Sequence, residues 1–334
     1  MTSIVIVTPD AVLLVRQGQA WTVETYLEGM KAGAVAVDES AGRLYVGTSG
    51  NGLYRSADGG RSWEALPFDH DQVSAVAVQN SSGAEQGVVY AGTAPSTFWR
   101  SDDGGESWQE QTAMTELPSA SEWSFPPQPD THHVRWIEPD PHVAGKLYVA
   151  IEAGALLRAE DGGQTWRDRV PGGPYDTHTA ATHPQAQGRV YSAAGDGYYE
   201  SADGGESWTR LMDGLRHRYL VGVAVDPGDA DTVVVSAARG PRMSYHPRGA
   251  EAYVYCKPAA AGPFKMAMEG LPPAEGTIAS RLATHAAQPG VFYAANNHGL
   301  FRSNVAERRW QALPVEWPEG VFRNRVNAVA VFEE

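Results

Sequence analysis

Four near-identical segments of eight residues recur along this chain and constrain its fold more than any other feature. Their tryptophans are 45, 58 and 42 residues apart. A period of roughly 40–50 residues is the length of one four-stranded blade of a β-propeller. The segments read SADGGRSW from Ser56, SDDGGESW from Ser101, AEDGGQTW from Ala159 and SADGGESW from Ser201.

Strand-like runs precede each segment in the same order. A run of small and branched residues such as AVAVD is followed by a run with tyrosine such as RLYVGT, and then by a third such as GLYRS. These short alternating runs favour strands over helices. Two further copies are degenerate, because residues 218–270 have lost the segment and residues 277–315 keep only its terminal Ser303 and Trp310.

The two ends of the chain supply the strands of one more blade. Pairing them would remove the free sheet edge that an open ring leaves. The sequence therefore predicts an all-β protein, a single domain over residues 1–334 that forms a seven-bladed β-propeller closed by its N- and C-terminal strands. We expect the blades at residues 32–70, 71–118, 131–172, 175–214, 218–270, 277–315, and 325–334 together with 2–28.

The residue types in the repeated segment indicate a structural turn. An aspartate side chain accepts hydrogen bonds from nearby backbone N–H groups in such turns, and paired glycines permit positive φ. The tryptophan ring is expected to pack between neighbouring blades. These structural residues are Asp58, Trp63, Asp103, Trp108, Asp161, Trp166, Asp203 and Trp208.

The segments resemble the Asp-box, or BNR-repeat, pattern S-x-D-x-G-x-[ST]-W, which is matched fully three times and nearly so at 159–166. The resemblance covers essentially the whole chain and implies a propeller. That group includes sialidases, xyloglucan-degrading hydrolases, sortilin-like receptors and photosystem II assembly factors, so it implies no single function. Length and blade count are most similar to the assembly-factor type. The Arg-Ile-Pro motif of sialidases is absent.

Composition limits the partners that we expect. The net charge of −14 argues against general binding to nucleic acid or to an anionic membrane. No stretch approaches the roughly 20 apolar residues of a membrane span. The N-terminal residues alternate like a strand and have no basic region typical of a signal peptide. A single cysteine, Cys256, allows no intrachain disulfide, and we expect a cytoplasmic protein.

Departures from the repeat indicate where function lies. Propeller loops that enter the first strands and that join the second and third strands gather at one end of the ring axis. Alignment of the first strands places His133 and His178 at equivalent positions, where other blades have uncharged residues. Two long insertions, 112–132 and 239–251, are expected over the same rim. The expected ligand-binding set is His132, His133, Arg135, Trp136, Asp176, His178, Arg218, Tyr219, His246, Arg281, His298 and Arg325.

Several functions remain open for this rim. The arginines favour a soluble binding protein for a small anionic molecule, a glycan or a peptide, and a protein partner also fits the loops. The alternatives are an enzyme of the glycoside hydrolase or lyase type, with Glu122, Glu152, Asp176 and Asp196 as the nearest carboxylates, or a metal-dependent enzyme. For the metal, Zn, Mn or Fe, the candidate ligands are His133, His178 and His217. Solvated loop residues without a ligand are a further interpretation.

Overall fold

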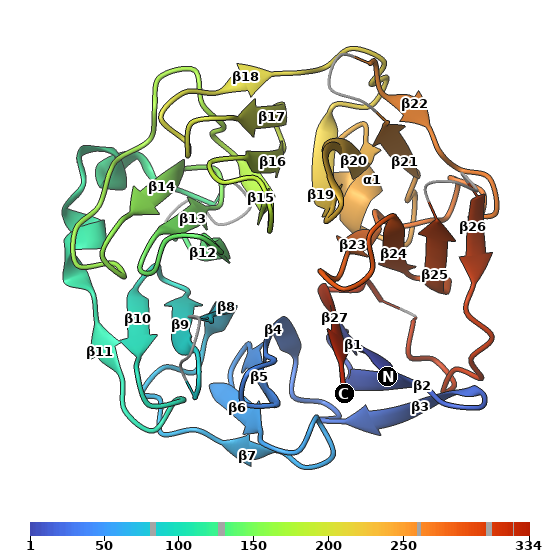
Figure 1. Cartoon of the computed structure of the whole chain (residues 1–334), viewed down its shortest axis with the longest axis horizontal. Coiled ribbons are helices and arrows are strands. Elements are labelled where there is room, and N and C mark those ends of the chain that lie inside the picture. Colours follow the sequence, from blue (N-terminus) through green and yellow to red (C-terminus); the bar gives the residue numbers. More distant parts are fainter. Residues whose placement is uncertain (81–84, 126–130, 259–261, 305–308, 323) are drawn as a thin grey trace.

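Seven antiparallel sheets are arranged in a ring (Figure 1). The computed structural model describes residues 1–80, 85–125, 131–258, 262–304, 309–322 and 324–334. Six sheets have four strands and one has three. The predicted seven-bladed propeller is confirmed, and no helix among the described residues is long and apolar enough to cross a bilayer.

Each blade is named here by its strands, from the inner to the outer edge. Blade 1 has β4 (Ala32–Asp38), β5 (Arg43–Thr48), β6 (Leu53–Ser56) and β7 (Glu64–Ala65). Blade 2 has β8 (Val73–Gln79), β9 (Val88–Thr93), β10 (Phe98–Ser101) and β11 (Gln109–Glu110). Blade 3 has β12 (Val134–Pro139), β13 (Leu147–Ile151) and β14 (Ala155–Ala159). Blade 4 has β15 (Thr177–Thr182), β16 (Val190–Ala194), β17 (Gly197–Ser201) and β18 (Thr209–Arg210).

The remaining three blades complete the ring. Blade 5 has β19 (Tyr219–Asp226), β20 (Asp229–Ala238), β21 (Ala252–Lys257) and β22 (Lys265–Met266). Blade 6 has β23 (Arg281–Ala283), β24 (Val291–Asn296), β25 (Gly299–Asn304) and β26 (Arg309–Ala312). Blade 7 has β27 (Ala328–Glu333), β1 (Thr2–Val7), β2 (Val12–Gln17) and β3 (Trp21–Tyr26).

Blade 7 joins the two ends of the chain, as predicted. β1 pairs with β27 over six residue pairs, from Thr2 with Glu333 to Val7 with Ala328. The amino group of Met1 donates to the backbone carbonyl of Glu334 at 2.9 Å. The Glu334 carboxylate accepts from Arg16 Nε at 2.8 Å and lies 2.9 Å from Arg61 Nη2 of blade 1. Backbone pairing and ion pairs therefore close the ring together.

In all four repeated turns the aspartate Oδ1 accepts from the backbone N–H four residues later. The serine that begins the segment accepts from the N–H of the second glycine in three of them, and Ala159 replaces this serine in blade 3. In blade 1, Asp58 Oδ1 accepts from the backbone N–H of Ser62 at 2.9 Å, and Ser56 Oγ accepts from the N–H of Gly60 at 2.7 Å. Gly60 has φ +92°, and a Cβ there would lie 2.8 Å from Leu14 of blade 7. The glycine is thus required both by its backbone angle and by the close approach of the next blade.

Apolar residues are buried mainly between blades rather than in one central core. For example, Val7 and Leu14 of blade 7 pack against Leu44 of blade 1, with the Trp63 ring against the same cluster. A regular arginine contact accompanies this packing. Arg16, Arg55 and Arg158 each donate to the carbonyl of a glycine in the repeated turn of the next blade. These bonds join the third strand of one blade to the repeated turn of the next.

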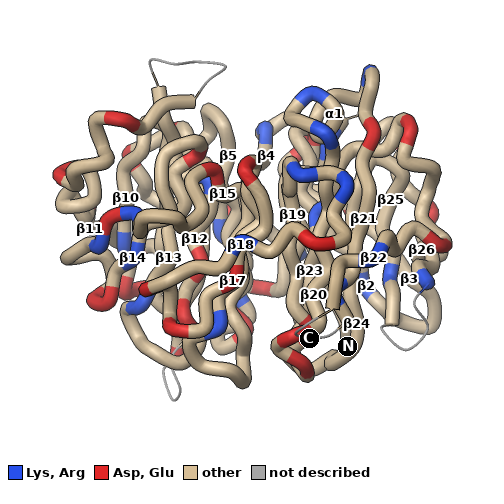
Figure 2. Tube along the Cα trace, turned by 90° about the horizontal axis from the view of Figure 1, so that it is seen from above, with Lys and Arg blue, Asp and Glu red and all other residues tan. Residues whose placement is uncertain are grey.

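The two insertions lie on the face opposite the chain termini. The first contains the 3₁₀ helices η1 (Thr112–Glu116) and η2 (Pro118–Glu122), and its residues 126–130 lie outside the described residues. The second contains the short helix α1 (Pro241–Tyr245). Figure 2 shows both termini on one face and α1 on the other, with basic positions around α1. We call the α1 side the top face.

Candidate functional site

β-Bulges interrupt five inner strands near the top face. The pairing of each of these strands skips one residue, at Gly33, Ser74, Arg135, His178 and Val221. A bulge leaves one residue unpaired and re-aims its side chain, and bulges are common beside functional sites. Only blades 3 and 4 have a charged or titratable side chain at this position.

This register corrects one sequence-based alignment. Arg135, and not His133, occupies the position equivalent to His178. His133 lies two residues earlier, before β12 begins. The alignment failed because the run VRWIEP lacks the small alternating residues that fix the register in the other blades.

The turn between β13 and β14 carries Glu152 to the neighbouring blade. The Glu152 backbone N–H donates to the His133 carbonyl at 3.2 Å. Ala153 has φ +46°, in the left-handed region, and its N–H donates to Asp176 Oδ1 at 2.9 Å. The turn of blade 3 and the entrance of blade 4 are thus fixed to each other.

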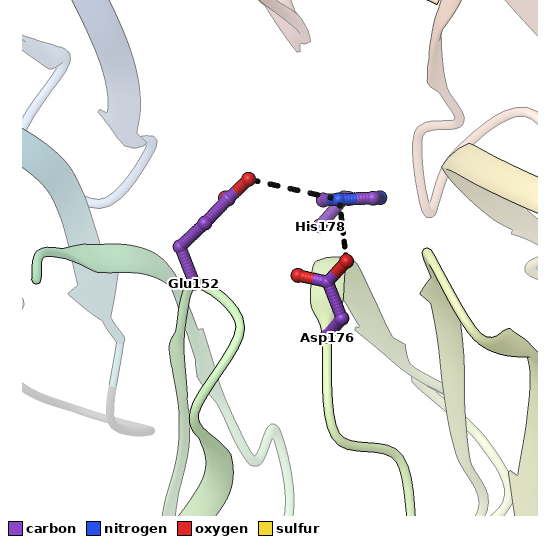
Figure 3. A group of neighbouring side chains, drawn as sticks. All are labelled: Glu152, Asp176 and His178. Carbon is purple, nitrogen blue, oxygen red and sulfur yellow. Dashed lines mark ion pairs between the residues drawn. The ribbon is translucent and has the colours of Figure 1, made fainter. Parts of the chain in front are cut away.

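His178 lies between two carboxylates (Figure 3). Its ring is fully buried, and its Nδ1 lies 2.5 Å from the Leu220 carbonyl oxygen. Because a carbonyl only accepts, Nδ1 carries the proton, and in the neutral ring Nε2 is an acceptor. Nε2 lies 3.7 Å from Glu152 Oε1, 3.6 Å from Asp176 Oδ2 and 3.1 Å from the Tyr219 hydroxyl.

Three arginines from three blades approach this group. Arg135 Nε lies 2.8 Å from Glu152 Oε2, without hydrogen-bond alignment. Arg281 is 7% exposed, and its hydrogen bonds to described residues go to two backbone carbonyls, at 3.3 Å to Val326 and 3.5 Å to Val221. The Arg325 guanidinium lies over the Tyr245 ring, 5.6 Å from its centroid.

Positively charged side chains outnumber carboxylates at this site. Burial, together with Arg135, lowers the pKa of Arg281 to about 9, and burial and Arg135 also lower the pKa of Arg325. Burial opposes the charge of Arg135, but Glu152 beside it keeps the pKa of Arg135 above its ordinary value. Within the described ranges no carboxylate pairs with Arg281. The group therefore has unpaired positive charge in a chain whose net charge is −14.

His178 and the neighbouring His133 are neutral at pH 7. Burial lowers the pKa of both His133 and His178 to about 4. Burial also raises the pKa of Asp176.

Two tyrosines complete the surroundings of His178. The His178 ring centroid lies 4.8 Å from that of Tyr219 and 6.2 Å from that of Tyr245. We call this set the top-face cluster; it consists of Arg135, Glu152, Asp176, His178, Tyr219, Tyr245, Arg281 and Arg325.

Most sequence-predicted residues reach the cluster or its edge. His133 Nε2 lies 3.8 Å from Glu152 Oε2, and the His132 ring meets the edge of Trp123 from the first insertion. Trp136 packs between blades 3 and 4 instead, and its indole N–H donates to Glu138 at 3.2 Å. Arg218, His246 and His298 are exposed, and no contact in the described part of the chain joins their side chains to the cluster.

The structure does not bring the three candidate metal-binding histidines together. His217 is stacked on Tyr253 at 4.0 Å between ring centroids, and its Nδ1 lies 2.6 Å from the Tyr255 hydroxyl. Among the described residues, the group with suitable ligand atoms close together is Glu152, Asp176 and His178. His178 is common to both sets.

Of the four candidate carboxylates, two meet. The ligand oxygens of Glu152 and Asp176 lie within 4.8 Å of each other. Glu122 instead forms an exposed ion pair with Arg169. Asp196 accepts from the Tyr199 hydroxyl at 2.6 Å and supports the Asp176 backbone N–H at 3.3 Å.

Two cluster residues were absent from the predicted ligand set. Glu152 follows an apolar strand, and no sequence motif shows that its turn crosses to the next blade. Tyr245 ends α1, which forms inside an insertion with no repeat to align. Its buried hydroxyl has no hydrogen-bond partner in the ranges that the structure describes.

A separate hollow of about 350 Å³ lies on the face of the chain termini, between blades 7 and 1. Its lining includes Asp58, Gly59 and Arg61 of the repeated turn and Phe332 to Glu334 of the last strand. These side chains are already engaged in the turn and in ring closure. The candidate functional residues therefore lie on the top face and not in this hollow.

Comparison with known proteins places the fold among seven-bladed propellers. No family model matches the sequence, and no curated protein is similar to it. An ancestral GH74 enzyme superimposes with a TM-score of 0.63 at 15% identity, over 90% of this chain and 38% of that one. The chain thus spans well under half of that enzyme.

Two binding proteins have the same architecture. A YCF48 structure with bound D1 peptide gives a TM-score of 0.58 at 15% identity, over 87% of this chain and 85% of that one. A propeller chain of a nidogen/laminin complex gives 0.52 at 10% identity, over 99% and 98%. Identities this low show a shared fold. Both enzymes and binding proteins use that fold, so the function of this chain must be argued from its own residues.

Proposed function

We propose that this propeller is a binding protein whose top-face cluster recognises a carboxylate-bearing ligand. The observation that carries the proposal is Arg281, a buried guanidinium with two long bonds to backbone carbonyls and no carboxylate partner among the described residues. Buried charges are usually paired, because removing a charge from water is costly. A ligand carboxylate would supply the missing partner.

The neighbouring side chains suit such a ligand. Arg135 and Arg325 offer planar forks that match carboxylate geometry, and they are more accessible than Arg281. Tyr219 and Tyr245 provide rings and hydroxyls beside them. A peptide, a glycan with acidic groups or a small organic acid all present this chemistry. The proposal includes a cytoplasmic location and membership of the Asp-box propellers, which the shared turn of the four segments supports.

The test is ligand binding by calorimetry with glucuronate, succinate and a short acidic peptide as probes. We expect at least one probe to bind, with affinity reduced about tenfold or more in Arg135→Gln and in Arg325→Gln. Arg218→Gln is the matched control, because Arg218 is exposed on blade 5 without a described contact to the cluster. Equal loss in the control, or no binding of any probe, would contradict the proposal.

A second candidate is an enzyme at the same cluster. The observation that favours it is the meeting of two carboxylates, Glu152 and Asp176, within 4.8 Å of each other beside His178. Paired carboxylates serve as acid and nucleophile or base in glycoside hydrolysis. Glycosides with acidic sugars are the substrates to screen. An enzyme predicts that Glu152→Gln abolishes turnover while substrate still binds, whereas a binding protein shows no turnover before or after the change.

A further inference from the structure

The Glu152 side chain is buried without the hydrogen bonds that a carboxylate normally requires. The residue is 8% exposed, and no donor among the described residues meets its carboxylate with hydrogen-bond geometry. Its contacts are the unaligned Arg135 Nε at 2.8 Å and the imidazole nitrogens of His133 and His178 at 3.8 and 3.7 Å. Buried carboxylates are ordinarily hydrogen-bonded, paired or bound to a metal.

The atoms that face one another between Glu152 and His178 are acceptors. His178 Nδ1 donates to the Leu220 carbonyl, so its Nε2 presents a lone pair toward Glu152 Oε1 and Asp176 Oδ2. Figure 3 shows the Glu152 and Asp176 carboxylates directed at the His178 ring. The Tyr219 hydroxyl lies 3.1 Å from Nε2 and would give up this contact when Nε2 binds an ion. Neither Glu152 Oε1 nor Asp176 Oδ2, the two oxygens that face the ring, accepts a hydrogen bond from a described residue, because the Ala153 N–H is bound to the other oxygen of Asp176. Three electron-pair donors therefore converge on one small volume.

From this geometry we propose a divalent transition-metal site formed by Glu152 Oε1, Asp176 Oδ2 and His178 Nε2. This set differs from the three histidines expected from the sequence. The two carboxylates supply the anionic ligands of such an ion, and a mixed imidazole and carboxylate set suits Mn²⁺ or Zn²⁺.

The distances fit an ion after a small closure of the side chains. Bonds of about 2.1 Å place neighbouring ligand atoms roughly 3.4 Å apart in tetrahedral geometry. The two distances from His178 Nε2, 3.6 and 3.7 Å, are close to that value, and all three atoms lie within 4.8 Å of one another. With three protein ligands, positions remain for water or a bound ligand.

The surroundings have the features of an outer ligand shell. A backbone carbonyl holds the Nδ1 proton of His178, which fixes the ring orientation as in known metal-bound histidines. The Ala153 N–H holds Asp176 Oδ1 and leaves Oδ2 toward the ring. Arg135 contacts Glu152 Oε2 and leaves Oε1 toward His178. Each ligand has one atom engaged by the protein and one directed at the site.

The test uses chelator-treated full-length protein titrated with MnCl₂ and with ZnCl₂ in separate calorimetric experiments. Stoichiometric binding of either ion is expected, with affinity reduced at least about tenfold in Glu152→Gln and in Asp176→Asn. For Mn²⁺, electron paramagnetic resonance of the bound ion should show the same loss. Glu138→Gln is the matched control, a half-buried carboxylate of the same blade that bonds to Thr182 and Trp136.

The outcomes are decisive in either direction. Wild-type protein that binds neither ion, or variants that bind as tightly as wild type, would overturn the site. Circular dichroism and thermal denaturation show whether each variant is folded, and if one of them unfolds the other carries the test. The metal titration contains no anionic ligand, so its result is independent of the proposed carboxylate binding. Loss of anion binding in Arg325→Gln with intact metal binding would separate the two.

Discussion

Arg135 of blade 3 and His178 of blade 4 occupy the same position of their inner strands, each on a β-bulge near the top face. Their nearest common neighbour is Glu152, which lies 2.8 Å from Arg135 and 3.7 Å from His178. A backbone irregularity shared by five blades thus presents two chemically different side chains to one carboxylate. The blades are alike in backbone and differ in what they carry at this point.

The first prediction concerns cooperation between metal and anion. The three arginines and two carboxylates of the cluster leave a small positive excess, and a divalent cation would increase it. Anion affinity measured with saturating Mn²⁺ or Zn²⁺ should therefore exceed that of the metal-free protein, by about tenfold. In Asp176→Asn the difference should vanish. An anion affinity that falls when metal is added would contradict this coupling.

Loss of a repeated-turn aspartate should cost stability and leave binding intact. Asp203 accepts from the backbone N–H and hydroxyl of Ser207 and from the hydroxyl of Ser201. Asp203→Ala is expected to lower the free energy of unfolding by roughly 2 kcal/mol, measured by urea denaturation. Glu116→Ala, which removes an exposed carboxylate with no described bond, is the control. A binding defect in Asp203→Ala would show that the turn has a direct functional role.

Stability should fall as pH rises through the titration of Glu138. Burial raises its pKa from 4.5 to about 7. The folded state then holds a proton that the unfolded chain releases above about pH 4.5, so this residue's contribution to stability decreases between pH 4.5 and 7. We expect a decrease of roughly 2 kcal/mol, seen as a falling melting temperature. In Glu138→Gln this component should be absent, and an unchanged pH profile in the variant would refute the assignment.

Stability should also fall at low pH, when the aspartates of the repeated turns become protonated. Hydrogen bonds from Ser62 lower the pKa of Asp58 to about 2, and those from Ser207 do the same for Asp203. Because the folded-state pKa lies below the ordinary 3.8, this stabilisation is present above about pH 4 and is lost as the pH falls to 2. Asp58→Asn should flatten the acid limb of a pH series of thermal melts. A variant whose melting temperature declines as steeply as that of wild type would contradict this origin.

The ring and its turns could be predicted because both depend on local sequence. The Asp58, Asp103, Asp161 and Asp203 segments carry their own turn chemistry, and alternation in the flanking runs sets the strands. The closure of blade 7 followed from counting strands.

The site was predictable only in part, because it depends on contacts between blades. The sequence indicated His178, Arg135 and Arg281 because they are polar residues near first-strand positions where most blades have uncharged residues. The role of Glu152 is set by a turn that crosses to blade 4, and Tyr245 is placed by α1 in an insertion without a template. The inter-blade contacts of Arg55 and Arg158 escaped notice for the same reason, since a sequence pattern within one blade does not show which residue of the next blade it meets.

The pairing of β1 with β27 also bears on how the ring is made on the ribosome. Blades 1 to 6 are each continuous in the chain and can form in order as they are synthesised. β1, with the apolar sequence SIVIV, is made first among the strands, and its partner β27 is made last. Until β27 is made, one edge of β1 has no partner strand. During that period β1 could pair with another nascent chain and aggregate.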